Sequence, residues 1–391
     1  MNRTNKLELE TKLTHIGTSP INQRGFVTPP LYKGSTVLYQ NVEDMRRSAK
    51  DFLKIQPPFY GRFGTPTSRS FEQAMSELEG GYAAITTSSG LAAITTTIQS
   101  LVKQGDHILI ADSAYLPTRR YCESLKRFGI NVEFYSASPS TNIKELIQSN
   151  TVLVYIETPG SLTFDIQDIP AITKICREQN IISVVDNTWA TPLFCRPMAL
   201  GADIVIHSAT KYITGHSDSI LGVIICSEKT YPLIRSGSII LGQCAGSEDI
   251  AMGLRGLRTL SVRLQLHQRQ GLEIATWLQQ RKEVHRVLHP ALKSHPGNDI
   301  WNRDFSGSTG LFSVELRDKY TTYDVDVFLN SLKLFGLGHS WGGFESLIVP
   351  IEDDKRSNER FKGRLLRIHI GLENIDDLRQ DLEQGFSKLS Y

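Results

Sequence analysis

Apolar residues in this chain gather in short runs that alternate with longer stretches of mixed polarity. The mixed stretches place apolar residues three or four positions apart, as Phe71, Met75 and Leu78 do, which is the spacing of one helix face. This alternation of strand and helix predicts a mainly parallel sheet with helices on both faces. The expected strands are Ala83–Thr87, His107–Ala111, Val132–Tyr135, Val152–Ile156, Ile181–Val185 and Ile204–His207.

The segments on either side of this region have different patterns. Residues 1–66 are rich in glycine and proline, so we expect an arm that becomes ordered by packing on something else. After Gly253 the apolar spacing predicts one long helix over Leu254–Gln280, leading into a smaller α+β part. We therefore divide the chain into an arm (1–66), an α/β domain (67–257) and a C-terminal α+β domain (258–391). The last domain is expected to have strands at Gly310–Leu316 and Leu365–Ile370 and helices at Val325–Leu334 and Ile375–Leu389.

Composition narrows the class of protein. The 391 residues, 40% hydrophobic and 21% charged, have the ordinary balance of a globular protein. A net charge of +2 is too small for a general attraction to nucleic acid or anionic membrane. The N-terminus lacks the apolar stretch of a secretory signal, and no apolar run approaches the ~18 residues of a membrane span. We expect a soluble, cytoplasmic protein that acts on a small molecule, with its five scattered cysteines reduced and mostly buried.

The densest group of candidate chemical residues is Ser208-Ala-Thr-Lys211-Tyr-Ile-Thr-Gly-His-Ser-Asp218, directly after an expected strand. A single lysine in such a place is usually a solvated surface group. Here the hydroxyls of Ser208 and Thr210 can donate to an anion, and the glycine lets the backbone approach a ligand closely. An aldehyde cofactor with a phosphate group, bound to Lys211, would use all of these residues.

Three further candidates stand where other strands end. Asp186 closes an apolar strand, so its carboxylate is expected at the ligand-binding edge of the sheet, where it can pair with the pyridine nitrogen of such a cofactor. Free amides at Gly90 and Leu91 open a helix and would face an anion. Tyr115 can stack on an aromatic ring. Taken singly, these features also fit structural roles: a capping aspartate, an ordinary capped helix and a tyrosine of the core or rim.

Together the motifs resemble the Cys/Met-metabolism family of pyridoxal-phosphate (PLP) enzymes over essentially the whole chain. Besides the Lys211 segment, the resemblance rests on Tyr60-Gly-Arg62, Asp186-Asn-Thr-Trp189 and Gly253-Leu-Arg-Gly-Leu-Arg-Thr259. It implies the aspartate-aminotransferase fold (PLP fold type I), with a mainly parallel central sheet and a smaller C-terminal α+β domain. It also implies PLP as the cofactor, no metal, and a homo-oligomer, expected to be a tetramer built from dimers with shared sites.

The same resemblance assigns roles to residues. Lys211 is implied to carry PLP as a Schiff base, Asp186 to pair with the pyridine nitrogen and Tyr115 to stack on the ring, with Lys211 and Tyr115 acting in catalysis. The residues implied to hold the phosphate are Gly90, Leu91, Ser208 and Thr210, together with Tyr60 and Arg62 from the arm of a neighbouring subunit.

Within this family the chain most resembles the bacterial cystathionine β-lyases. In Ser340-Trp341-Gly-Gly-Phe-Glu-Ser346, γ-acting relatives typically have Leu in place of Trp, and Glu157-Thr-Pro-Gly160-Ser differs from their Thr-Asn-Pro ending. Thr158 departs mildly from the Ser that is more usual in the β-lyases. The resemblance implies cleavage of cystathionine to homocysteine, pyruvate and ammonia, as in methionine biosynthesis. It also implies that Arg367 and Ser340 hold the substrate α-carboxylate beside Trp341.

Three other functions stay open at this stage. A γ-acting relative, cystathionine γ-synthase or γ-lyase, would share every cofactor residue. A lyase-like protein that serves mainly as a regulatory binding partner is a second alternative, although the intact set of lysine, aspartate and arginine argues for activity. A metal hydrolase that uses His207, His216 and Asp218 is the third, and the spacing of these residues matches no standard ligand pattern.

Overall fold

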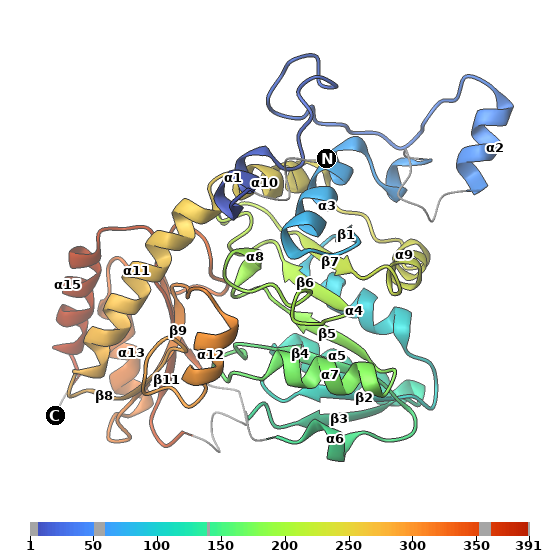
Figure 1. The fold of residues 1–391 in the computed structure, drawn as a ribbon. Coiled ribbons are helices and arrows are strands. Elements are labelled where there is room, and N and C mark those ends of the chain that lie inside the picture. Colours follow the sequence, from blue (N-terminus) through green and yellow to red (C-terminus); the bar gives the residue numbers. More distant parts are fainter. Residues whose placement is uncertain (1–6, 51–58, 139–140, 352–360, 390–391) are drawn as a thin grey trace.

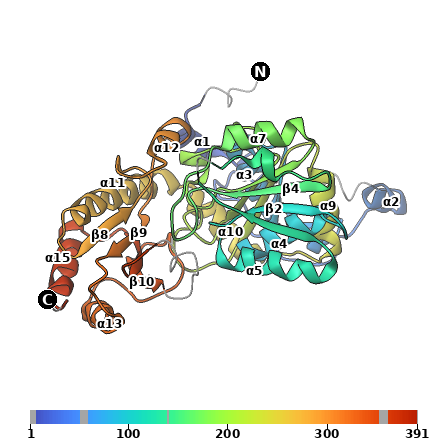
Figure 2. The same ribbon diagram turned by 90° about the horizontal axis from the view of Figure 1, so that it is seen from below.

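The computed structural model describes residues 7–50, 59–138, 141–351 and 361–389 and contains two β-sheets (Figures 1 and 2). The strands are β1 Ala83–Thr87, β2 His107–Ala111, β3 Asn131–Tyr135, β4 Thr151–Glu157, β5 Ile182–Asp186, β6 Ile204–Ser208, β7 Gly222–Cys226, β8 Val284–Leu288, β9 Leu311–Leu316, β10 Leu347–Ile351 and β11 Leu365–His369. The helices are α1 Leu9–His15, α2 Val42–Lys50, η2 Gly61–Phe63, α3 Pro66–Glu79, α4 Gly90–Leu101, α5 Leu116–Leu125, η3 Lys126–Phe128, α6 Ile143–Leu146, α7 Ile169–Glu178, α8 Thr191–Phe194, α9 Tyr231–Ile240, α10 Ser247–Leu257, α11 Leu260–Gln279, α12 Asn298–Asp304, α13 Thr322–Ser331 and α15 Ile375–Phe386.

The larger sheet has seven strands in the order β1-β7-β6-β5-β4-β2-β3. The pairs β6–β5, β5–β4, β4–β2 and β2–β3 are parallel, whereas β7 runs antiparallel to both of its neighbours. The prediction of a mainly parallel sheet is confirmed. β7 is the strand of this sheet that the apolar pattern did not predict, because no helix separates it from β6 and the expected alternation is broken there; in the small sheet, β8 and β10 were likewise not predicted.

Successive side chains of the central strands enter two different cores. On β5, Val184 packs with the residues of α4, α5 and α9, whereas Val185 packs with those of α3, α7 and α10. The same division separates Ile204 from Val205 on β6. Because both faces of these strands are buried, their sequences are continuous apolar runs rather than alternating ones. The helices therefore cover both faces, as predicted (Figure 2).

The smaller sheet is antiparallel, in the order β10-β11-β9-β8, and packs with α11, α13 and α15 around a core of its own. The predicted helix over Leu254–Gln280 is wrong in one respect, because the structure has two helices, α10 and α11, with a break at Arg258 and Thr259. Arg258 donates to the carbonyl of Leu13 in α1, at 2.7 Å, and α11 leads away from the large sheet to the small one (Figure 1). The proposed domain boundaries stay a prediction.

The arm has little core of its own, as its breakers suggested. α1 lies on the body through the buried Leu13, whereas α2 buries no side chain and projects away from the rest of the molecule (Figure 1). Ile21 is 94% exposed and Leu38 89% exposed, an unusual placement for large aliphatic side chains. Within the described part of the chain, these two side chains are not covered by another surface.

The remaining expectations from composition concern cysteines and membranes. Cys122, Cys176, Cys195 and Cys226 are buried free thiols and Cys244 is an exposed one, which confirms the prediction of mostly buried thiols. Within the part of the chain that the structure describes, no helix has the length and apolar character needed to cross a bilayer.

The smaller core supplies a test of packing. Phe328 of α13 is fully buried and stacks on Phe386 of α15, with ring centroids 4.9 Å apart. We expect Phe328→Ala to lower the free energy of unfolding by about 3–5 kcal/mol, because the lost ring leaves a cavity. Tyr323→Ala on the same helix, where the side chain is 74% exposed, should change it by less than about 0.5 kcal/mol. Urea unfolding followed by circular dichroism measures both, and equal losses would contradict this packing.

Candidate active site

A cavity of about 380 Å³ lies where the strands of the large sheet end, closed on its other side by residues from β11 and the loop before β10. Strands β4, β5 and β6 are mutually parallel and β1 runs in the same direction as β6, so their C-terminal ends meet at this edge. Ten of the predicted site residues line this cavity: Gly90, Leu91, Tyr115, Asp186, Ser208, Thr210, Lys211, Ser340, Trp341 and Arg367.

Lys211 lies in the loop that joins β6 to β7. Its Nζ donates to Ser340 Oγ at 2.5 Å and lies 5.4 Å from the centre of the Trp341 ring. Burial lowers the pKa of the Lys211 amine to about 8, and the positive charge of Arg367 contributes to this lowering. A lysine with this pKa is present partly as the neutral, nucleophilic amine near neutral pH.

The cationic wall of the cavity comes from the small sheet. Arg367, on the central strand β11, donates from Nη2 to the carbonyl oxygen of Ser340 at 2.9 Å. Ser340 has a φ of +79°, a left-handed conformation that a serine seldom adopts. This turn brings the hydroxyl of Ser340 to Lys211 and its carbonyl to Arg367. One residue therefore contacts both basic groups.

A buried acidic residue, Asp186, also lines the cavity and is the last residue of β5. Its carboxylate accepts a hydrogen bond from the backbone N–H of Thr188 at 3.0 Å and from the Tyr155 hydroxyl at 3.2 Å. Burial raises the pKa of the Asp186 carboxyl, while the bonds from Thr188, the nearby His207 and the bond from Tyr155 act in the opposite direction. A buried carboxylate with such partners is suited to hold a cationic group of a ligand.

The predicted anion cradle is formed where α4 meets the end of β6. Ser89 caps α4 by accepting from the amide of Ala92 at 3.0 Å, and the first amides of the helix follow at Gly90. A Cβ at Gly90 would lie 2.5 Å from the Ser208 side chain, so only glycine allows this approach. The Thr210 hydroxyl both donates to the carbonyl of Leu221 and accepts from its amide.

Tyr115 is placed at the mouth of the cavity. It is 48% exposed, and its backbone N–H donates to Glu157 Oε2 at 2.8 Å, which fixes the start of α5. Burial raises the pKa of the Tyr115 hydroxyl; Glu157 adds to this and Arg367 opposes it. The ring therefore borders the same space as the two basic groups.

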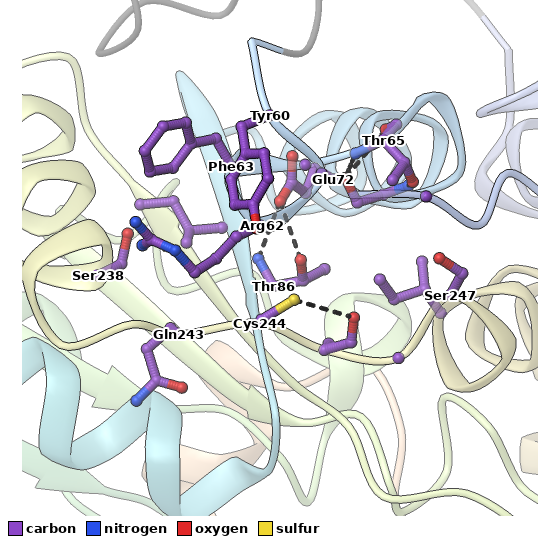
Figure 3. Close-up of a pocket in the computed structure, with 18 of the residues that line it drawn as sticks. Tyr60, Arg62, Phe63, Thr65, Glu72, Thr86, Ser238, Gln243, Cys244 and Ser247 are labelled. Atoms are coloured by element: carbon purple, nitrogen blue, oxygen red, sulfur yellow. Dashed lines mark hydrogen bonds between the residues drawn. The ribbon is translucent and has the colours of Figure 1, made fainter. Parts of the chain in front are cut away.

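Tyr60 and Arg62 do not line the Lys211 cavity of their own chain. They border a second cavity, of about 440 Å³, between the arm and α9 (Figure 3). Arg62 donates from Nη1 to the carbonyl of Ile239 at 2.9 Å. Their assignment to the site of a neighbouring subunit stays a prediction.

Sequence reasoning missed Tyr155, whose hydroxyl reaches Asp186 from the adjacent strand β4. A tyrosine in an apolar strand gave no sign of this contact, although its hydroxyl, once buried, needs a partner. The rival metal site is not assembled: His207 Nε2 pairs with Glu79 at 2.6 Å, and His216 Nδ1 donates to the Thr214 carbonyl at 2.7 Å. In residues 7–50, 59–138, 141–351 and 361–389 there is no group of three potential metal ligands.

Comparison with known proteins decides the family. Residues 10–387 match the model of the Cys/Met metabolism PLP-dependent enzymes. The chain belongs to this family. It is 38% identical to cystathionine beta-lyase from Haemophilus influenzae over 98% of its own length and 99% of the relative's. It is also 38% identical to L-alanine/L-glutamate racemase from Wolbachia pipientis wMel, over 97% of each chain. The crystal structure of metB from Corynebacterium glutamicum covers 100% of both chains with a TM-score of 0.89 and 33% identity.

The PLP fold and cofactor predicted from the sequence are therefore confirmed, whereas family members at similar identity have different named activities. The cavity fits PLP on the grounds of its own residues. It holds an amine for the aldehyde at Lys211, a buried carboxylate for the pyridine nitrogen at Asp186, and a helix N-terminus beside Gly90 for the phosphate. The roles of the individual residues toward PLP stay predictions.

The lowered pKa of Lys211 can be tested by following attachment of PLP to the apoenzyme as a function of pH. Only the neutral amine attacks the aldehyde, so the attachment rate should rise with a midpoint near pH 8 instead of the usual 10.5. Arg367→Met should move the midpoint to higher pH, because it removes a positive charge that favours the neutral amine. Arg364→Met, at an exposed position beside β11, is the control and should leave it in place. A midpoint near 10 in the unmodified protein would contradict the buried amine.

Proposed function

We propose that this protein is a carbon-sulfur β-lyase that cleaves L-cystathionine, with one water, to L-homocysteine, pyruvate and ammonia. The observation that carries the proposal is that one turn, at Ser340, contacts both the Lys211 amine and the Arg367 guanidinium in the cavity. The similarity to a relative named cystathionine beta-lyase supports it.

In this proposal the cofactor residues are those that the cavity brings together. Lys211 binds the aldehyde, Asp186 the pyridine nitrogen and Tyr115 the ring, while the phosphate-holding residues are Gly90, Leu91, Ser208 and Thr210. When bound, PLP supplies an electron sink for the negative charge left at the substrate Cα. Tyr155 and Thr188 keep the Asp186 carboxylate in place.

Lys211 is the base that removes the Cα proton. With substrate and cofactor bound, Lys211 would be a free amine, which must be neutral to accept a proton. Burial and the charge of Arg367 lower the pKa of Lys211 to about 8 and so maintain a neutral fraction. The Ser340 hydroxyl, 2.5 Å from Nζ, orients the amine toward one side of the cavity.

Arg367 holds the substrate α-carboxylate. A guanidinium has five N–H donors in a planar fork, and the bond to the Ser340 carbonyl uses one of them. Burial lowers the pKa of Arg367 only from a very high ordinary value, so the group remains charged. With the carboxylate fixed there, Cα lies between Arg367 and Lys211.

Trp341 favours β- over γ-elimination by its bulk. The indole packs on the buried Tyr212, with ring centroids 5.3 Å apart, and borders Lys211. β-Elimination needs only that the bond from Cβ to sulfur aligns with the electron sink, whereas a γ-reaction needs a further proton removal at Cβ. A rigid wall that limits the positions of the distal arm supports the simpler reaction.

The site is proposed to be completed by a second copy of the chain. Tyr60 and Arg62 lie outside the Lys211 cavity of their own chain, and the arm exposes aliphatic side chains such as Ile21 and Leu38. Burial of these side chains against a neighbouring subunit would place the arm at a symmetric interface. The active unit is then at least a dimer, with a tetramer expected.

Product analysis tests the reaction. Purified holoenzyme with L-cystathionine should release homocysteine and pyruvate in equal amounts, because the sulfur on Cβ leaves with the four-carbon part. Mass spectrometry and a keto-acid assay distinguish these from cysteine and 2-oxobutyrate, and chiral chromatography after incubation with L-alanine detects racemisation. We expect Trp341→Leu to weaken β-cleavage while PLP stays bound. Either 2-oxobutyrate or D-alanine as the main product would overturn the β-lyase assignment.

Mixed oligomers test the shared site. Arg62→Ala chains and Lys211→Ala chains should each be inactive, because every site in either oligomer lacks one of the two residues. Unfolding and reassembly of the two chains together should restore activity, since one site of each mixed dimer has both residues intact. Two tags select the mixed species, and mixing differently tagged Lys211→Ala chains is the control. Absence of recovery in verified mixed dimers would count against a shared site.

A further inference from the structure

A buried carboxylate, Glu72 on α3, contacts two segments that the proposed function assigns to different cofactor sites. The side chain is 5% exposed and borders the second cavity, beside the turn that carries Tyr60 and Arg62. Its Oε1 accepts from the backbone N–H and from the hydroxyl of Thr86, each at 3.0 Å, as Figure 3 shows. Its Oε2 accepts from Arg69. The two oxygens of one carboxylate are therefore directed to two different elements.

The first oxygen fixes the strand that leads into the proposed phosphate cradle of its own subunit. Thr86 lies near the end of β1, and the chain continues directly into α4. The Thr87 hydroxyl donates to the carbonyl of Ser89 at 2.9 Å, and Ser89 caps the helix. A shift of Thr86 would thus pass along a short, hydrogen-bonded segment to the amide of Gly90.

The second oxygen fixes the turn proposed to serve the neighbouring subunit. Arg69 donates from Nη1 to Glu72 at 2.9 Å and from Nη2 to the carbonyl of Phe63 at 3.2 Å. Arg235 of α9 donates to the same carbonyl at 2.6 Å. Phe63 directly follows Arg62 and ends the short helix η2. Two guanidinium groups therefore hold the backbone of the turn beside Arg62.

Charge makes this arrangement depend on Glu72. Arg69 and Arg235 converge on one carbonyl oxygen, and Arg235 is only 4% exposed. Arg235 is buried and Arg69 is partly buried, so two cations that share one carbonyl oxygen here need a compensating anion, and the Glu72 carboxylate is in direct contact with Arg69. Burial acts to lower the pKa of Arg69, but the negative charge of Glu72 opposes this and the pKa is raised. Burial lowers the pKa of Arg235, and the charge of Glu72 opposes that lowering.

We propose that Glu72 is a positioning residue that couples two cofactor sites, holding the α4 cradle of its own subunit through Thr86 and the Tyr60–Arg62 turn through Arg69. The inference rests on the proposed function, in which that turn completes the phosphate site of the neighbouring subunit. Glu72 touches neither cofactor nor substrate. Its effect is on the affinity for PLP, through the placement of groups that bind the phosphate.

Cofactor affinity provides the first measurement. Apoenzyme is titrated with PLP, and the absorbance of the cofactor bound at Lys211 gives the dissociation constant. Glu72→Gln removes the negative charge that compensates Arg69 and Arg235, and its single acceptor oxygen cannot serve both Thr86 and Arg69. We expect the dissociation constant to rise by about tenfold or more, the effect of losing one charged hydrogen bond. Glu77→Gln, an exposed change of the same type on α3, should leave it within about twofold, the scale of surface substitutions.

Mixed dimers then separate the two contacts, because only a chain that retains Lys211 contributes to the absorbance. When a Glu72→Gln chain is paired with a Lys211→Ala chain, the change lies in the subunit that binds the observed PLP and affects its α4 cradle. When an unmodified chain is paired with a chain that carries both Glu72→Gln and Lys211→Ala, the change lies in the neighbouring subunit and affects the turn that this subunit donates. Both pairs should bind PLP more weakly than the pair of unmodified and Lys211→Ala chains.

The outcomes are distinct. Unchanged affinity in the second pair would overturn the coupling, since Glu72 would then act only within its own subunit. A chain that carries Arg62→Ala and Lys211→Ala, paired with an unmodified chain, tests the proposed function itself. If PLP binding is weakened by Arg62→Ala but not by Glu72→Gln, the role of Glu72 is overturned and the shared site stands. If neither change has an effect, both the role of Glu72 and the shared site are overturned. If Glu72→Gln chains fail to assemble, Arg69→Gln is used in their place. It should weaken PLP binding only when it is on the chain that donates the Tyr60–Arg62 turn. Equal weakening when it is on either chain would overturn the proposal.

Discussion

The burial of two basic groups in one cavity is the constraint on which the rest of the site depends. Lys211 and Arg367 contact the same residue, Ser340, and each is destabilised as a cation by its surroundings. The arginine cannot give up its proton at ordinary pH, so the lysine becomes the group whose charge adjusts. Asp186 lines the same cavity, where its carboxylate is held by Tyr155 and Thr188. The cavity thus contains basic groups suited to carboxylate and aldehyde groups and a buried carboxylate suited to a cationic ring.

The acidic and basic groups of the cavity come from two different sheets, which must lie side by side to form it. The large sheet supplies Asp186 and Lys211 at the ends of neighbouring strands, and the small sheet supplies Arg367 from its central strand β11. The loop before β10 closes the gap, and it comes so near that a Cβ on Gly342 would lie 2.8 Å from the backbone nitrogen of Tyr212. Gly342 has a φ of +84° and Ser340 one of +79°. The conformational strain of this loop is compensated by contacts that a more relaxed turn would not reach.

The sequence was informative where local pattern determines position. An apolar run that ends in Asp186 predicts a carboxylate at the sheet edge, and the structure has it there because parallel strands share that edge. Local pattern does not report contacts between distant segments. The hydroxyl of Tyr155 on Asp186 and the antiparallel strand β7 both depend on how elements pair. The break before α11 likewise reflects packing against α1 through Arg258, since the apolar spacing continues across it.

In the proposed function the two sheets have different tasks, and this division is consistent with the different activity names of relatives at similar identity. Most groups proposed to bind PLP lie on the large sheet and its helices, and they serve any reaction that begins with proton removal from Cα by Lys211. β-Elimination and loss of chirality both begin in this way. They diverge in whether a leaving group on Cβ is aligned when the charge develops. In the proposed function, that alignment is set by Arg367, which holds the carboxylate, and by the side chain of Trp341. Reaction choice would then depend on a few residues of the small sheet and the loop before β10, which contribute little to the identity over the whole chain.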